Sequence, residues 1–470
     1  MSGLLIEHAE VLVTMDSDRR EIANAAIFTD DRQVLFVGTS NEVRKWILDQ
    51  GEKADRVIDA SGTVIIPGLV NCHHHLYQTL TRSVGTAQGL SIFNWLETLY
   101  PIWGQMDAEA VYLSAKLGLV ELILSGATTV ADHLYLFPND STLDDEIRAA
   151  QELGVRFHPT RGSMSLGASQ GGLPPDEVCE DEDDILADCK RVIETFHDPA
   201  PLSILRIGLA PCSPFSVTAD LMKKTAELAR CYPAVNLHTH LAETVDENRF
   251  CQQQFGMLPL EYMQSLGWTG DDVWFAHMVH LNRDEIATLA QTATGVCHCP
   301  SSNMILASGI APIREMRDTG VRIGLGVDGS ASNDANHLLG EARQAMLLQR
   351  VGWPGFESKA DRFSAREALE IATLGGAAVL GRDDIGSLET GKAADLVAFR
   401  VDDLTHAGGM SDPVASLLTC APGKAWLSVI NGKVVVEDGE IPELDIDSLV
   451  TSHNLLSRQL LEKAAALKTQ

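Results

Sequence analysis

Histidines and acidic residues recur in this sequence where short apolar runs end. The first group is His73-His74-His75, in PGLVNCHHHLYQ. If this run is extended, the side chains of His73 and His75 point to one side and that of His74 to the other. Neutral imidazole nitrogens suit zinc, and a catalytic zinc takes about three protein ligands plus water. We therefore interpret His73 and His75 as candidate metal ligands and His74 as a packed or hydrogen-bonded support, although an H-x-H pair alone is a weak signal.

A second group, HTHLAE, contains His238, His240 and Glu243 at the end of another strand-like run. His240 would be a third ligand, and Glu243, just past the strand end, would overhang the metal as a proton carrier. A surface carboxylate is the alternative interpretation of Glu243. Alternation puts His238 on the same side as His240, so spacing alone does not exclude it as a ligand.

Two more groups complete the set: WFAHMVH contains His277, and GLGVDGSASND contains Asp328. A carboxylate at the end of a buried strand needs a cation. Asp328 can give one oxygen to the metal and, with its free oxygen, accept a proton from water. His277 can hydrogen-bond the hydroxide or the developing oxyanion, and His280 is a weaker candidate for that role.

The elements that must position these residues form a repeating pattern. Between residues 68 and 385, strand-like runs alternate with helical segments, which predicts a parallel sheet. The runs are VIIPGLVN, ATTVADHL, VRFHPTRG, ILRIGLAP, AVNLHTHLAE, DVWFAHMVH, TGVCHCP and VRIGLGVDG. Eight such runs predict a (β/α)₈ barrel, whose active site lies at the carboxyl ends of its strands. The polar residues above lie at those ends.

Both ends of the chain are rich in short alternating strands instead. They occupy residues 1–67 and, after Gly391, the segments DLVAFRVDD, WLSVINGK and KVVVEDGE. We expect the two ends to pair into one small β-sandwich. The predicted organisation is therefore residues 1–67 and 386–470 in the β-sandwich, the latter with a terminal helix, and residues 68–385 in the barrel.

Composition excludes several classes of protein. The formal net charge of -29 gives a surface that repels phosphate backbones, so we expect no nucleic-acid polymer as a partner. The nine cysteines are odd in number and scattered, which favours reduced thiols over a disulfide framework. The sequence has no secretory pattern at its N-terminus and no run of 18 apolar residues. We predict a cytoplasmic protein that does not span a membrane.

Taken as a set, the motifs resemble those of the amidohydrolase superfamily, in its branch of mononuclear zinc deaminases and triazine hydrolases. The motifs are PGLVNCHHH, SGATTVAD, HTHLAE, FAHMVH, CPSSNMILASG, GLGVDGSASND and GKAADLV. The resemblance implies four metal ligands and two catalytic partners. The ligands are His73, His75, His240 and Asp328, and the partners are Glu243 and His277. On this ground, and not on spacing, His238 is left out of the ligand set.

The resemblance also implies one zinc ion, with Fe²⁺ or Mn²⁺ as alternatives. Two-metal relatives carry a bridging lysine, and this chain has none near Arg161-Gly162-Ser163. Many relatives carry Asp where this chain has Asn71, a position that we interpret as supporting. Homo-oligomers are common among such enzymes, and we expect one here.

Residues that would bind the substrate are harder to identify from the sequence. The candidates at the barrel mouth are Gln78, Trp103, Arg161, Cys212 and Ser213. A guanidinium at Arg161 could donate to a purine carbonyl, or could instead bridge loop carboxylates between Glu180 and Asp184. Trp95 could stack on a flat ring, but we favour a packing role for it.

Within the branch, the segment after the first strand, TRSVGTAQGLSIFNWLETLYPIW, and the loop RGSMSLGASQGGLPPDEVCEDEDD resemble those of the deaminases of 8-oxoguanine. This implies hydrolysis of a free aminopurine to urate and ammonia by metal-bound hydroxide, with Glu243 and Asp328 as proton carriers. Hydroxyatrazine-type triazines, isoxanthopterin and guanine remain alternative substrates, since their enzymes share the scaffold. A metal-free barrel that only binds its ligand is the alternative outside catalysis, and an assay that finds no bound metal would favour it.

The other zinc deaminase architecture uses H-x-E and P-C-x-x-C ligands. This chain has C-H-C-P at residues 297–300 instead. We therefore interpret Cys297 and Cys299 as strand residues packed inside the barrel.

Overall fold

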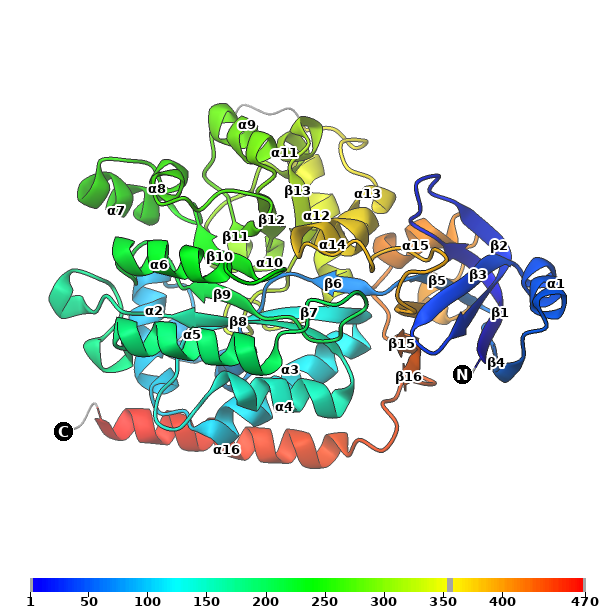
Figure 1. Ribbon diagram of the computed structural model, residues 1–470, viewed down its shortest axis with the longest axis horizontal. Helices are drawn as coiled ribbons and strands as arrows, with labels where there is room; N and C mark the ends of the chain where they lie inside the picture. Colours follow the sequence, from blue (N-terminus) through cyan, green and yellow to red (C-terminus); the bar gives the residue numbers. More distant parts are fainter. Residues whose placement is uncertain (1–2, 353–357, 468–470) are drawn as a thin grey trace.

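A closed barrel of eight parallel strands forms the middle of the protein (Figure 1). The computed structural model describes residues 3–352 and 358–467. The barrel strands follow one another in chain order, each bonded to the next, and β13 closes on β6. They are β6 Leu69–Asn71, β7 Ala127–Leu134, β8 Arg156–Ser163, β9 Gly208–Pro211, β10 Asn236–Leu241, β11 Val273–His277, β12 Gly295–His298 and β13 Arg322–Leu325. Each predicted run contains one of these strands, so the predicted barrel is confirmed.

Helices alternate with the strands and surround the barrel (Figure 1). They are α2 Ile92–Trp103, α3 Ala108–Leu124, α4 Leu143–Leu153, α5 Glu182–Phe196, α6 Ala219–Ala229, α7 Val245–Phe255, α8 Pro259–Ser265, α9 Arg283–Thr292, α10 Pro300–Ile305, α11 Ile313–Thr319, α12 Leu338–Val351, α13 Ala365–Glu370 and α14 Gly376–Val379. Their ends follow local sequence rules. α4 begins with a capping box between Thr142 and Asp145, and it ends at Gly154 in the left-handed conformation.

A mixed sheet beside the barrel contains strands from both ends of the chain (Figure 1). Its order is β16-β15-β14-β5-β1-β2-β3, and β4 also pairs with β1. The bounds are β1 Gly3–Val13, β2 Glu21–Asp30, β3 Gln33–Thr39, β4 Ala54–Asp59, β5 Thr63–Pro67, β14 Leu396–Arg400, β15 Ala425–Ile430 and β16 Lys433–Val436. Helix α1 (Ser40–Gln50) packs on β3 and β2. This sheet and α1 form the satellite, and the prediction that the two ends combine is confirmed.

The satellite and the barrel are joined tightly. Only Gly68 separates β5 from β6, and a Cβ atom there would lie 2.0 Å from the Thr128 hydroxyl oxygen. Across the same junction, the buried Arg156 guanidinium donates to both carboxylate oxygens of Asp395, at 2.7 and 3.1 Å. The satellite is therefore joined to β6 through Gly68 and to β8 through Arg156.

The last part of the chain leaves the satellite and returns to the barrel. After the short helix α15 (Pro413–Thr419), the long helix α16 (Ile446–Leu467) lies along the barrel beside α3 (Figure 1). The buried ring of His453 hydrogen-bonds the Thr79 hydroxyl at 3.0 Å, and the Ser457 hydroxyl donates to the Leu80 carbonyl at 2.6 Å. Among the described residues, no helix has the length and apolar character needed to cross a membrane.

Candidate active site

The predicted metal ligands meet at the carboxyl end of the barrel. His73 and His75 follow β6, His240 lies on β10, and Asp328 follows β13. The side chains of His73, His75 and Asp328 are 5% exposed or less, and His240 is partly exposed. The Asp328 amide donates to the His73 carbonyl at 3.1 Å, so barrel closure itself brings these two residues together. Residues far apart in the sequence are thereby collected into one cluster.

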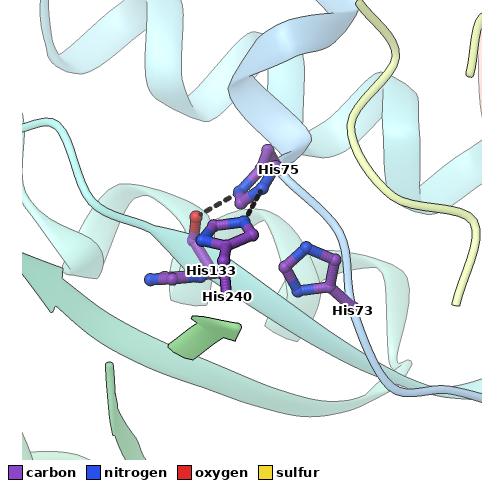
Figure 2. A group of neighbouring side chains, drawn as sticks. All are labelled: His73, His75, His133 and His240. Atoms are coloured by element: carbon purple, nitrogen blue, oxygen red, sulfur yellow. Dashed lines mark hydrogen bonds between the residues drawn. The ribbon is translucent and has the colours of Figure 1, made fainter. Parts of the chain in front are cut away.

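The imidazoles of His73, His75 and His240 converge (Figure 2). Each of their Nδ1 atoms is bound elsewhere. Nδ1 of His75 donates to the His133 carbonyl and Nδ1 of His240 to the Cys212 carbonyl, both at 2.7 Å. Nδ1 of His73 lies 2.8 Å from Nε2 of His238. A neutral ring that donates from Nδ1 has only a lone pair on Nε2. Burial lowers the pKa of His73, His75 and His240, so the rings are neutral near pH 7.

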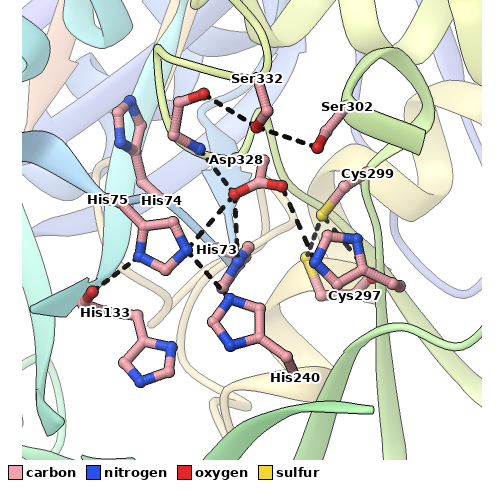
Figure 3. A network of polar contacts seen from close by, with 12 residues as sticks. His73, His74, His75, His133, His240, Cys297, Cys299, Ser302, Asp328 and Ser332 are labelled. Carbon is pink, nitrogen blue, oxygen red and sulfur yellow. Dashed lines mark hydrogen bonds and ion pairs between the residues drawn. The ribbon is translucent and has the colours of Figure 1, made fainter. Parts of the chain in front are cut away.

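The distances between the lone pairs fit a shared cation. Nε2 of His75 lies 3.0 Å from Nε2 of His240, and Oδ1 of Asp328 lies 3.3 Å from Nε2 of His73 and 3.5 Å from that of His75 (Figure 3). Two lone pairs at such a distance repel unless a positive charge lies between them. Ligands about 2.1 Å from a tetrahedral zinc lie ~3.4 Å from one another. Nε2 of His73 is also buried without a hydrogen-bond partner. Three neutral imidazoles and one carboxylate therefore suit a divalent ion such as zinc.

Asp328 is held as a carboxylate in a constrained backbone. The Gly329 amide donates to its Oδ1 at 2.6 Å, a hydrogen bond that favours the charged form of the carboxyl. Its φ of 66° and the φ of 75° at His277 are left-handed values that residues other than glycine rarely adopt. Such conformations cluster at sites that must aim a side chain.

Asn71 ties the surrounding strand ends together. Its amide nitrogen donates to the carbonyls of His73 and Ala131, at 3.2 and 3.4 Å. Its amide oxygen accepts from the Val327 amide at 2.9 Å. One side chain thus joins the ends of β6, β7 and β13, which gives a structural reason for the supporting role that the sequence suggested.

Glu243 lies at the mouth of the site with a carboxyl suited to hold a proton. It is 5% exposed, and burial raises its pKa, an effect to which the charge of Asp328 adds and which His277 opposes. The Ser308 hydroxyl donates to its Oε1 at 3.3 Å, and its backbone amide donates to Glu247 at 2.8 Å. The side chain is therefore fixed in place and can be a proton donor.

His277 lies between the two acidic side chains. Its Nδ1 is 2.9 Å from Oδ1 of Asn303, while its Nε2 is 3.7 Å from Asp328 and 3.8 Å from Glu243. Burial disfavours its charged form, but these two carboxylates raise its pKa above the usual value. His280 hydrogen-bonds the Ser308 carbonyl and does not line the same pocket.

A pocket opens over the cluster, and both polar and apolar residues line it. His75, His240, Glu243, His277 and Asp328 are among its lining residues. The remaining polar lining residues are Gln78, Tyr135, Cys212, Ser213 and Ser332, and the apolar ones are Ile92, Trp95, Leu96, Phe215 and Leu306. A flat ring with polar edges fits such a lining. Three of the five predicted substrate-binding residues, Gln78, Cys212 and Ser213, are therefore at the pocket.

Arg161 is not at the pocket, which corrects its prediction as a substrate donor. Its guanidinium donates to Glu180 at 2.6 and 3.0 Å and to Asp188 at 2.9 Å. It also lies 3.9 Å above the Phe137 ring, and the residue is 3% exposed. Because its donors are occupied by Glu180 in the loop and Asp188 on α5, the bridging alternative fits the structure.

Trp103 was expected at the pocket and Trp95 in a packing role, but it is Trp95 that lines the pocket. Trp103 is fully buried, donates its indole N–H to the Thr81 hydroxyl at 3.0 Å and packs against Tyr77 and Tyr100. Trp95 lines the pocket and contacts Trp103 edge to face at 5.5 Å. Trp103 thus supports Trp95, because α2 turns the later tryptophan inward.

Sequence reasoning missed several residues of the site. His133 stacks on the His240 ring at 4.9 Å, and one of its ring nitrogens lies close enough to join the histidine cluster (Figure 2). Asn303 and Ser308 hold His277 and Glu243. All three occur in motifs noted above, ATTVADHL and CPSSNMILASG, so position in a motif was the available signal. His74 is buried, with Nδ1 3.9 Å from Asp132.

The cysteines near the cluster are free thiols. Cys297 and Cys299 are fully buried, with their sulfur atoms 3.9 Å apart (Figure 3). They pack with Cys72 and Trp274 in a small apolar cluster.

Comparison with known proteins identifies the family of this chain. Residues 64–435 match the model of the amidohydrolase family. The 8-oxoguanine deaminase of Pseudomonas aeruginosa is 45% identical over 443 residues, which cover 94% of this chain and 96% of that protein. The hydroxydechloroatrazine ethylaminohydrolase of Pseudomonas sp. (strain ADP) is 36% identical over 416 residues, with 87% and 85% coverage.

A solved structure shows the same architecture. The atrazine chlorohydrolase from Arthrobacter aurescens TC1, complexed with zinc, superposes with a TM-score of 0.90 at 35% identity, covering 97% of this chain and 100% of that one. The chain therefore belongs to the amidohydrolase family, as a metal-dependent hydrolase that cleaves carbon–nitrogen bonds in cyclic amidines.

Proposed function

We propose that this enzyme deaminates a free aminopurine, with 8-oxoguanine as its preferred substrate and urate and ammonia as products. The observation that carries the proposal is the convergence of His73, His75, His240 and Asp328 beneath a pocket that also holds Glu243. The 45% identity to an 8-oxoguanine deaminase over nearly the whole chain supports the choice of substrate.

One zinc ion is the proposed cofactor, held by those four residues. When bound, zinc lowers the pKa of a coordinated water and polarises an attached oxygen. Asp328 accepts a proton in this scheme, because Oδ1 faces His73 and His75 while Oδ2 remains free beside His277. Glu243, with its raised pKa, donates a proton to the ring nitrogen next to the carbon under attack.

His277 would stabilise the oxygen that gains charge during attack. Its Nδ1 proton is committed to Asn303, and the raised pKa favours a second proton on Nε2, which faces the reacting centre. A donor held in advance at such a point lowers the barrier without reorganisation. The same residues then return protons to the leaving amine, and ammonia departs.

A panel of substrates tests this proposal. Ammonia release would be measured with 8-oxoguanine, guanine, isoxanthopterin, cytosine and hydroxyatrazine, and urate would be followed by its absorbance. We expect the highest kcat/KM with 8-oxoguanine. A clear preference for the triazine would overturn the choice of a purine and favour the second candidate, hydrolysis of a hydroxyatrazine-type triazine, which the apolar lining residues Ile92, Leu96 and Leu306 support.

A further inference from the structure

His238 lies directly behind the metal-ligand cluster and has a partner at each ring nitrogen. Its Nδ1 is 3.0 Å from the Trp274 carbonyl, which can only accept a hydrogen bond. The proton of the neutral ring therefore lies on Nδ1, and Nε2 carries a lone pair. That lone pair accepts from Nδ1 of His73 at 2.8 Å.

The acceptor for His73 differs in kind from those of the other two imidazole ligands. His75 and His240 donate to main-chain carbonyls, which have no other protonation state. His73 instead donates to a side chain whose own ring has two tautomers. The Trp274 carbonyl sets the direction of this hydrogen bond, because it keeps the His238 proton on Nδ1.

Trp274 also holds the ring of His238 in position. The two rings are stacked, with centroids 4.4 Å apart and planes 17° from parallel. The indole N–H of Trp274 donates to the Cys72 carbonyl at 3.1 Å, just before His73 in the chain. Both residues are buried, so this arrangement leaves His238 a single useful orientation.

We propose that His238 is a positioning residue that fixes the tautomer of His73 and so keeps Nε2 of His73 open for the metal. Without the acceptor at His238, the neutral His73 ring is free to carry its proton on Nε2, and in that tautomer Nε2 has no lone pair for the metal. Orienting partners of this kind typically contribute 10–100-fold to metal affinity. The proposal rests on the proposed zinc loading, but not on the identity of the substrate.

Three variants test the role of the hydrogen bond. His238→Phe keeps a flat ring against Trp274 but removes the acceptor, whereas His238→Gln offers an amide oxygen near the position of Nε2. His158→Phe is the matched control: His158 is also buried, its ring lies 5.9 Å from that of Trp274, and both of its ring nitrogens lack a hydrogen-bond partner. Zinc affinity would be measured on the metal-free proteins by chelator competition, alongside their thermal unfolding midpoints.

We expect His238→Phe to weaken zinc binding by 10–100-fold, and His238→Gln and His158→Phe to stay within a few-fold of the parent. The proposal is overturned if His238→Phe binds zinc like the parent, if His238→Gln is as weak as His238→Phe, or if His158→Phe loses as much affinity. If the parent protein itself binds no zinc, the proposed cofactor fails first. A triazine preference in the substrate panel would leave this result untouched.

Discussion

At the scale of single residues, Glu243 is the side chain whose replacement should separate turnover from metal binding. Glu243→Gln keeps the size and the contact with Ser308 but removes the transferable proton. We expect kcat to fall by about 10²–10⁴-fold, the usual contribution of a general acid or base, with zinc content unchanged. Ammonia release and elemental analysis would be measured on the same preparation. Full activity with stoichiometric zinc would remove Glu243 from the proposed scheme.

The pH profile gives a second prediction at this scale. Glu243 must be protonated to donate, and its pKa is raised, so activity should fall as the pH rises through that pKa. The Ser308 hydroxyl bond stabilises the charged carboxylate and lowers the pKa. Ser308→Ala should therefore move the alkaline limb of kcat/KM to higher pH, by up to about one unit. A shift to lower pH would contradict this assignment, and Ser332→Ala, at the pocket but not bound to Glu243, is the control.

At the scale of elements, the sequence predicted the strand ends well and their surroundings poorly. Each proposed ligand follows an apolar run, because a buried strand that ends in a polar residue leaves a strong local pattern. The partners of His75 and His240 are main-chain carbonyls, which have no signature in the sequence. Arg161, at a strand end, and Trp103, at the end of helix α2, were misplaced for a related reason: which side chain faces the pocket depends on segments packed from elsewhere.

Asn71 offers a test of how the strand ends depend on one another. Asn71→Ala removes an acceptor for Val327 and donors to two carbonyls, all of them buried. Leaving such groups unpaired should cost about 2–4 kcal/mol in the free energy of unfolding. Asn71→Asp keeps the acceptor for Val327 but sets a buried carboxylate oxygen against the carbonyls of His73 and Ala131, so it should lose at least as much. Urea unfolding of the metal-free proteins measures both, and an unchanged Asn71→Ala variant would show that Asn71 does not tie the strands together.

At the scale of the whole molecule, a buried ion pair links the barrel to the satellite. Arg156→Met would leave Asp395 charged and buried, so we expect a loss of about 3–5 kcal/mol in the free energy of unfolding. Arg249→Met breaks an exposed pair with Asp246 and should cost less than about 1 kcal/mol. Urea unfolding compares the two, and equal losses would show that burial of the junction contributes nothing.

Because only Gly68 separates β5 from β6, a change in the satellite sheet is transmitted to the segment that carries His73 and His75. β5 is hydrogen-bonded by β14, which comes from the far end of the chain, along the whole register from Thr63–Arg400 to Pro67–Leu396. Beyond Gly68 the same stretch of backbone continues to His73 and His75. Proteolysis that releases β14 would therefore loosen the start of the segment that carries His73 and His75, and we expect the proposed ion to be lost although its ligand atoms remain chemically intact.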